Sequence, residues 1–146
     1  MIELVVAILV IGVSLSGTLT LVDTTTRRSA DPMLERQALA IAEAYLEEIL
    51  LKDYVDPDTG TLCPTAEADR SLYDNVCDYH GLDDSGARNQ SGTAIAGLDG
   101  YRVQIVVDTT ATLGTLSGSG DVVRVDATVT DPQGRIVALS SYRTNS

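Results

Sequence analysis

The stretch that decides the fold is Leu4-Val-Val-Ala-Ile-Leu-Val-Ile-Gly-Val-Ser-Leu-Ser-Gly-Thr-Leu-Thr-Leu-Val22, which contains no charged residue. As a helix rising about 1.5 Å per residue, it would be about 28 Å long, close to the roughly 30 Å hydrocarbon core of a bilayer. A secretory signal peptide is one alternative, but such a peptide starts with basic residues, and Met1-Ile2-Glu3 is acidic. A buried core helix is another, but no other segment is apolar enough to cover it on all sides. The stretch therefore predicts a membrane-spanning helix.

Three residues in or beside this stretch are candidates for contacts with other helices. Glu3 stands at its start, where a carboxylate is costly in lipid and is usually interfacial or functional. Gly12 and Ser16 form a small-xxx-small face that permits close approach of a neighbouring helix. We expect Glu3 to take part in assembly, and Gly12 and Ser16 in helix packing.

The signals for orientation in the membrane conflict. Arg27 and Arg28 follow the stretch, and the positive-inside rule alone would place the C-terminal part in the cytoplasm. Cys63 and Cys77, with thirteen residues between them, favour a disulfide in an oxidising compartment instead. A basic leader before Met1 would reconcile the two signals, and we expect one.

A second helical segment follows. Asp31-Pro32 is typical of an N-cap followed by Pro at the first helical position. Apolar residues then recur at the helical period and charged residues occupy the other side. The apolar stripe consists of Leu34, Ala38, Ile41, Tyr45 and Ile49, with Ala42, Leu46 and Leu50 beside it. We predict a membrane or filament-core segment over residues 1–28 and a head over residues 29–146 that begins with an amphipathic helix over residues 32–53.

Residues 53–84 are acidic, with nine Asp or Glu against one base, Arg70. Asp56 and Asp58 with Gly60 resemble the start of a calcium loop, although the late bidentate Glu of such loops is missing. A solvated acidic loop is the alternative. We therefore predict calcium binding at Asp56 and Asp58 that is weak or absent, and no other metal or cofactor.

The C-terminal part has the period of half-buried strands. Tyr101 to Asp108 and Val123 to Thr130 each alternate apolar and polar residues. Arg135 to Arg143 is expected to be a third strand, with Ile136, Ala138 and Tyr142 on one face, and Thr110 to Gly120 is a flexible connection by composition. We predict a disulfide-containing loop over residues 54–100 and a small antiparallel sheet over residues 101–143. The fold class is α+β, with the amphipathic half of a long N-terminal helix packed on the sheet.

Composition excludes several classes of function. The chain has 146 residues and a net charge of −11, which suits one domain with an appended helix and excludes nucleic-acid binding, since that needs clustered Lys and Arg. The sequence has one His and two Cys and no Ser/His/Asp arrangement, phosphate-binding Gly loop or metal triad. His80 beside Asp78 would be a catalytic pair, but a turn-capping or structural role is favoured. We expect no enzymatic activity and no small-molecule substrate.

Together, these segments resemble a type IV pilin-like protein. The likeness lies in Ile2-Glu3-Leu4-Val5-Val6-Ala7-Ile8-Leu9. In that family a basic leader ending in Gly precedes Phe-Thr-Leu-Ile-Glu, a membrane peptidase cuts after the Gly, and the new N-terminus is methylated. Glu3 matches the family's near-N-terminal glutamate. Gly, Phe and Thr are absent here, and Met1 stands where the family has Leu, so we expect the gene to start upstream.

Other segments are similar to MshD-type minor pilins of the mannose-sensitive haemagglutinin (MSHA) pilus system. They include Ser29-Ala30-Asp31-Pro32, Tyr73-Asp74-Asn75-Val76-Cys77-Asp78-Tyr79-His80-Gly81 and Gly97-Leu98-Asp99-Gly100-Tyr101. The resemblance implies a minor pilin of the inner membrane with its C-terminal domain in the periplasm. It also implies pilin-like subunits and the inner-membrane assembly machinery as partners. The alternatives are a minor pseudopilin of a type II secretion system and a membrane-anchored periplasmic binding module with an acidic cation site.

Overall fold

The computed structural model describes residues 32–117 and 120–145, together with Glu3, Val6 and Ile11. The chain divides into two compact units, Met1–Leu34 and Glu35–Ser146. The second unit contains the sheet and most of the helix described below. Glu3, Val6 and Ile11 are helical and exposed. The rest of the predicted span at residues 4–22 lies outside the described residues. Among the residues that are described, none belongs to a helix with the length and apolar character needed to cross a membrane.

Residues 32–50 form an α-helix with one buried face. The buried side chains follow the predicted stripe and are Ala38, Ile41, Ala42, Tyr45, Leu46 and Ile49. The helix ends at residue 50, before the predicted end at residue 53. The reason is that Lys52 N–H donates to Ile49 C=O over 3.0 Å, which tightens the last turn, and Asp53 pairs with another segment. Asp53 N–H donates to Asp74 C=O, and Val76 N–H donates to Asp53 C=O, each over 3.0 Å.

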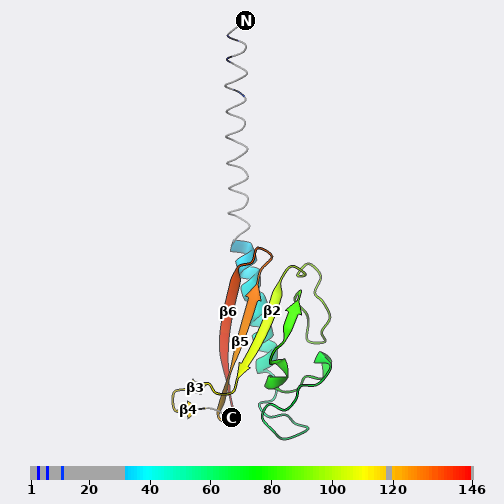
Figure 1. Ribbon diagram of the computed structural model, residues 1–146, viewed down its shortest axis with the longest axis vertical. Coiled ribbons are helices and arrows are strands. Elements are labelled where there is room, and N and C mark those ends of the chain that lie inside the picture. Colours follow the sequence, from blue (N-terminus) through cyan, green and yellow to red (C-terminus); the bar gives the residue numbers. More distant parts are fainter. Residues whose placement is uncertain (1–2, 4–5, 7–10, 12–31, 118–119, 146) are drawn as a thin grey trace. The chain divides into compact units, whose positions relative to one another are not determined.

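Four antiparallel strands form the main sheet, in the order β1-β2-β5-β6 (Figure 1). Their bounds are Asp83–Ser85 for β1, Arg102–Asp108 for β2, Val122–Thr130 for β5 and Ile136–Thr144 for β6. The alternating pattern predicted β2 and β5, and β6 lies where the third strand was expected. The face named for that strand, Ile136, Ala138 and Tyr142, is its exposed face, and Val137 and Leu139 are half-buried instead. The pattern missed β1, which lies within the segment predicted as a loop over residues 54–100. The fold class is α+β, with a helix and a four-stranded antiparallel sheet.

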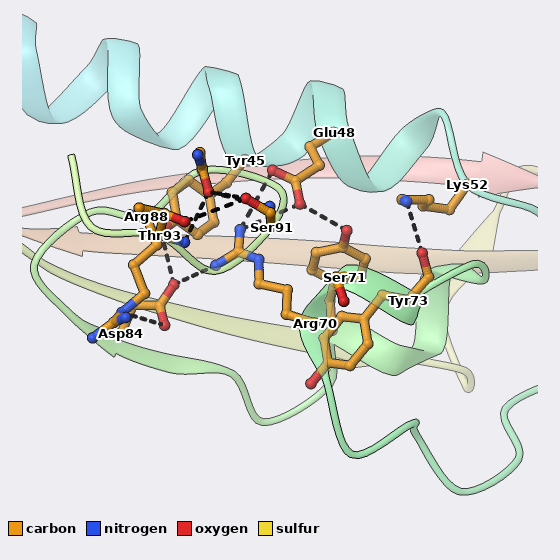
Figure 2. A network of polar contacts seen from close by, with 12 residues as sticks. Tyr45, Glu48, Lys52, Arg70, Ser71, Tyr73, Asp84, Arg88, Ser91 and Thr93 are labelled. Atoms are coloured by element: carbon orange, nitrogen blue, oxygen red, sulfur yellow. Dashed lines mark hydrogen bonds and ion pairs between the residues drawn. The ribbon is translucent and has the colours of Figure 1, made fainter.

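The core lies between the helix and one face of the sheet, since the helix runs along that face in two views (Figures 1 and 2). Alternate residues of the two central strands are buried there: Val103, Ile105 and Val107 of β2, and Val123, Val125, Ala127 and Val129 of β5. Burying such an aliphatic side chain contributes about 1.5–3 kcal/mol. The helix covers β2 and β5 more completely than β6, whose residues are all exposed or half-buried.

The segment predicted as a flexible connection, Thr110 to Gly120, contains a short hairpin instead. β3, Thr112–Leu113, pairs with β4, Leu116–Ser117. Gly114 between them has φ +63°, which a residue with a side chain adopts only at a cost. The prediction went wrong because the turn chemistry at Gly114 was not recognised.

Candidate functional site

The acidic segment is held against the helix and sheet by two short 3-10 helices and a disulfide. η1, Arg70–Leu72, is capped by Asp69, whose carboxylate accepts from Ser71 N–H. η2, Val76–Tyr79, has a capping box in which Asn75 accepts from Cys77 N–H and Asp78 accepts from Asn75 N–H. The predicted Cys63–Cys77 disulfide is confirmed, with Cα atoms 4.9 Å apart. Together they fold an acidic segment that has few apolar side chains of its own.

Three carboxylates from different parts of this segment lie together. Oxygen atoms of Asp56, Glu67 and Asp74 all lie within 4.8 Å of one another. Two of these carboxylates have an oxygen that is buried and has no hydrogen-bond partner, Glu67 Oε2 and Asp74 Oδ1. Asp58, the other predicted calcium ligand, is exposed and is not part of this group. Sequence reasoning therefore found Asp56 and missed Glu67 and Asp74.

Asp56 is already engaged by its own loop. It is 2% exposed. Its Oδ1 accepts from Thr59 N–H and its Oδ2 accepts from Asn75 Nδ2 over 3.2 Å. Such bonds from an Asp side chain to the backbone a few residues on are typical of turns. The carboxylate therefore has a structural role whether or not it also binds an ion.

The pKa values of the three carboxyls differ in direction. Backbone and side-chain hydrogen bonds from Thr59 hold the pKa of Asp56 below its usual value. Burial, and then the charges of Asp56 and Asp78, raise the pKa of Asp74. A backbone hydrogen bond lowers the pKa of Glu67, but burial and the neighbouring Asp78 outweigh it, and the net shift is upward. The group thus has carboxylates held close together with little compensating positive charge, which is the environment that a hard cation would relieve.

A buried polar network joins this segment, including Asp84 of β1, to the helix (Figure 2). Arg70 donates through Nη1 to Asp84 Oδ2 over 2.6 Å and through Nη2 to Glu48 Oε1 over 3.3 Å. Its guanidinium also lies 4.9 Å from the centre of the Tyr45 ring and 5.8 Å from that of Tyr79. One cation therefore satisfies an acid from the helix and an acid from β1.

Two tyrosines complete the network. Tyr45 OH donates to Asp84 Oδ2 over 2.8 Å and accepts from Arg88 N–H over 2.8 Å. Tyr79 OH donates to Glu48 Oε1 over 2.7 Å, and burial, followed by this carboxylate, raises the pKa of Tyr79. Most polar atoms of the network pair with one another, whereas Arg70 Nε is buried without a hydrogen-bond partner among the described residues. The network therefore positions the acidic segment against the helix.

His80 and Asp78 do not contact each other as a catalytic pair would. His80 is exposed, and its Nδ1 accepts from Val107 N–H over 3.1 Å. Asp78 is buried and accepts from the backbone N–H groups of Asp74 and Asn75. Both side chains fasten loops to the neighbouring backbone.

Of the three residues predicted to contact other helices, the structure describes one. Glu3 lies on an exposed helical position. Gly12 and Ser16 lie outside the described residues. Comparison of the chain with known protein families, with curated proteins and with solved structures finds no match.

Proposed function

We propose that this chain is a minor pilin of a type IV, MSHA-like pilus that acts in pilus assembly, initiation or tip formation. Its N-terminal helix would hold it in the inner membrane, with the head in the periplasm until assembly carries it to the cell surface. The observation that carries the proposal is the helix at residues 32–50, which follows the apolar stretch in sequence and buries one face on an antiparallel sheet. The disulfide supports it, because disulfides persist in an oxidising compartment such as the periplasm.

The test is deletion of the gene in its own bacterium, with the unaltered gene supplied again as the control. We expect the deletion to remove most surface pili while the other pilins remain in the inner membrane, and the supplied gene to restore the pili. Normal piliation with impaired protein secretion would favour the pseudopilin alternative. A deletion that changes neither piliation nor secretion would contradict both assignments.

A membrane-anchored module that binds a divalent cation is the second candidate. The observation that favours it is the pair of buried oxygens without hydrogen-bond partners, Glu67 Oε2 and Asp74 Oδ1, close to Asp56. Calcium prefers oxygen ligands and takes 6–8 of them. Three carboxylates, one already engaged by Thr59 and Asn75, supply only part of that number, so the expected affinity is weak, with a Kd of about 10⁻⁴–10⁻³ M as in extracellular modules.

Calorimetric titration of the full chain in detergent with calcium chloride separates the two candidates. We expect weak binding that is lost in Asp74→Asn and kept in Asp58→Asn, since Asp58 is an exposed acid outside the group. A sub-micromolar affinity would make cation binding the primary function. No heat of binding, or equal loss in both variants, would remove this candidate.

A further inference from the structure

The two edges of the main sheet differ in how they are protected from other strands. β1 ends the sheet with three residues, of which Asp83 and Asp84 are acidic. β6 ends it on the other side with nine residues. Proteins commonly protect a sheet edge with a short strand, a charged side chain, a Pro or a bulge. β6 contains no Lys or Pro and a single charge, Arg143 near its C-terminal end, and its pairing with β5 runs without a bulge from Ile136 to Thr144.

The outer side of β6 carries an unpaired row of backbone donors and acceptors. Asp131 N–H donates to Arg135 C=O over 2.9 Å, and Asn145 N–H donates to Asp121 C=O over 3.1 Å. These two hydrogen-bonded pairs lie just beyond the two ends of the β5–β6 pairing and continue its register. They show that Arg135 and Asn145, and every second residue between them, direct their backbone groups toward β5. Alternate residues of an antiparallel strand point their N–H and C=O toward the partner and away from it. The residues that point away from β5 are therefore Ile136, Ala138, Ser140, Tyr142 and Thr144, and in the part of the chain that the structure describes no strand pairs with them.

The side chains on this edge suit a mainly uncharged partner strand, since Ser140 already binds Asp126 of β5 and the one charge of β6, Arg143, is half-buried. Ile136 is 68% exposed and Tyr142 is 40% exposed, so two large apolar side chains stand in solvent. The acidic segment over residues 53–84 lies on the β1 side of the sheet, away from β6 (Figure 1). β6 itself has no acid, and Arg143 Nε is buried without a hydrogen-bond partner among the described residues.

We propose that β6 is a docking edge for an extended strand of a different pilin-like subunit, which runs antiparallel to β6 and adds a fifth strand to the sheet. This inference rests on the proposed function, since it takes the partner from the same pilus. Backbone hydrogen bonds to the outward-facing residues supply the affinity, as in other cases of strand addition. The partner strand has about the length of β6, carries no Lys or Arg opposite Arg143, and covers Ile136 and Tyr142.

A second copy of this chain does not fit the same place. Joining β6 to β6 in antiparallel fashion requires a two-fold axis perpendicular to the sheet, which turns the helices of the two copies in opposite directions. Subunits anchored in one membrane point their helices the same way. A copy standing the same way up would instead offer β1, whose three residues would leave most of β6 unpaired.

Cross-linking in the living bacterium tests the proposal on the full chain. A photo-reactive amino acid is placed in turn at Ala138, Ser140 and Tyr142, and at Gln104 of the central strand β2 as the control. We expect the three edge positions to cross-link to one other pilin-like subunit, at sites that move backward along its sequence as the probe moves forward. Cross-links only to a second copy, cross-links without this reversed order, or none beyond the Gln104 level would overturn the proposal.

Two variants test whether the outward-facing backbone groups of β6 are responsible for the cross-linking. Ala138→Pro removes one outward-facing N–H without touching a β5–β6 hydrogen bond, whereas Ala138→Ser keeps that N–H. We expect at least a tenfold loss of cross-linking from Tyr142 in the proline variant and no change in the serine variant. Should the proline variant fail to accumulate, Ala138→Lys replaces it, because it keeps every backbone bond and places a charge on the edge; equal cross-linking in the lysine and serine variants would then overturn the proposal.

The outcome also separates this inference from the proposed function. A chain that is recovered in sheared pili but gives no ordered cross-links from β6 leaves the minor-pilin assignment in place and overturns the docking edge. Ordered cross-links to a protein outside the pilus overturn the stated partner and count against the minor-pilin assignment as well.

Discussion

Arg70 and Asp84 form a buried ion pair, with 2.6 Å between Nη1 and Oδ2 and 7% and 10% of the two side chains exposed. Arg70 comes from η1 and Asp84 from β1, so the pair fastens the acidic segment to the edge of the sheet. Glu48 joins it from the helix at 3.3 Å. Without Arg70, the carboxylates of Glu48 and Asp84 would lie in a poorly solvated place without their closest cation. The burial of an acid in β1 therefore depends on the Arg70 guanidinium.

Removal of Arg70 should therefore destabilise the head strongly. We expect Arg70→Ala to lower the free energy of unfolding by about 3–5 kcal/mol, because Glu48 and Asp84 stay largely buried without their closest cation. Arg88 remains beside Asp84, but at 3.6 Å and with an exposed side chain. Arg102→Ala, which removes an exposed pair with Asp83, is the control and should cost much less. Denaturant unfolding of the full chain in detergent measures both. Similar losses in the two variants would mean that the buried network contributes no more than a surface ion pair.

This pair also explains what the sequence could and could not predict. The strands β2 and β5 were predictable, because alternation of Val, Ile and Ala with polar residues is a local pattern. The position of β6 was predictable too, but its buried face was not, since Ile136 to Leu139 are all apolar. β1 was not predictable, because Asp83-Asp84-Ser85 is polar and acidic. The closest partners of the buried Asp84 are Arg70 and Tyr45, which are distant in sequence, and only the longer contact with Arg88 is local.

The group of Asp56, Glu67 and Asp74 could likewise be predicted only in part. Asp56 stood out through its spacing from Asp58 and Gly60, which is a local pattern, whereas Glu67 and Asp74 join it through long-range contacts. The Cys63–Cys77 disulfide and the backbone bonds between Asp53 and residues 74–76 bring these stretches together. The two cysteines indicated one of these closures, but no local pattern in the sequence places Glu67 and Asp74 beside Asp56.

The disulfide should contribute measurably to stability. Closing a loop of this size is worth about 3 kcal/mol in the chain-entropy model. We expect the paired change of Cys63→Ser and Cys77→Ser to cost about that much, and hydrogen exchange to increase mainly over residues 54–82. Mass spectrometry of the protein without reductant should show no free thiol. Two free thiols there, or unchanged exchange in the variant, would contradict this prediction.

The stability of the head should depend on pH with opposite signs at two acids. The pKa of Asp74 is raised in the folded protein by burial and by Asp56 and Asp78. Its charged form therefore destabilises the fold at neutral pH, and this penalty disappears as the pH falls through the raised pKa. We expect Asp74→Asn to stabilise the chain at pH 7 and to have progressively less effect toward pH 4, as followed by thermal unfolding.

Asp131 is the matched control for that experiment. Burial alone would raise its pKa, but hydrogen bonds from the backbone and side chain of Arg135, and from Gln133 N–H, hold its pKa below the usual value. Its charged form stabilises the fold above the unfolded pKa, and this contribution is lost as the pH falls through the lowered pKa. Asp131→Asn should thus destabilise at pH 7. Changes of the same sign in the two variants would contradict the assignment of their pKa shifts.

Glu3 should matter for assembly and not for membrane insertion. In the proposed pilus, the span leaves lipid and packs among like helices, where an unpaired carboxylate is expensive. Its available partner is a positive charge at the N-terminus of a neighbouring helix, and a subunit displaced along the filament axis would lose that partner. We expect Glu3→Val, made in the full-length gene, to leave the membrane level unchanged or raised while recovery in sheared pili falls.

Glu35→Gln, a neutralised acid at an exposed position of the helix outside the span, is the control and should incorporate normally. Normal incorporation of Glu3→Val would contradict the role of Glu3 in the filament, and equal losses in both variants would trace the defect to charge in general. A fall in the membrane level itself would instead show that Glu3 acts before assembly, at insertion or processing.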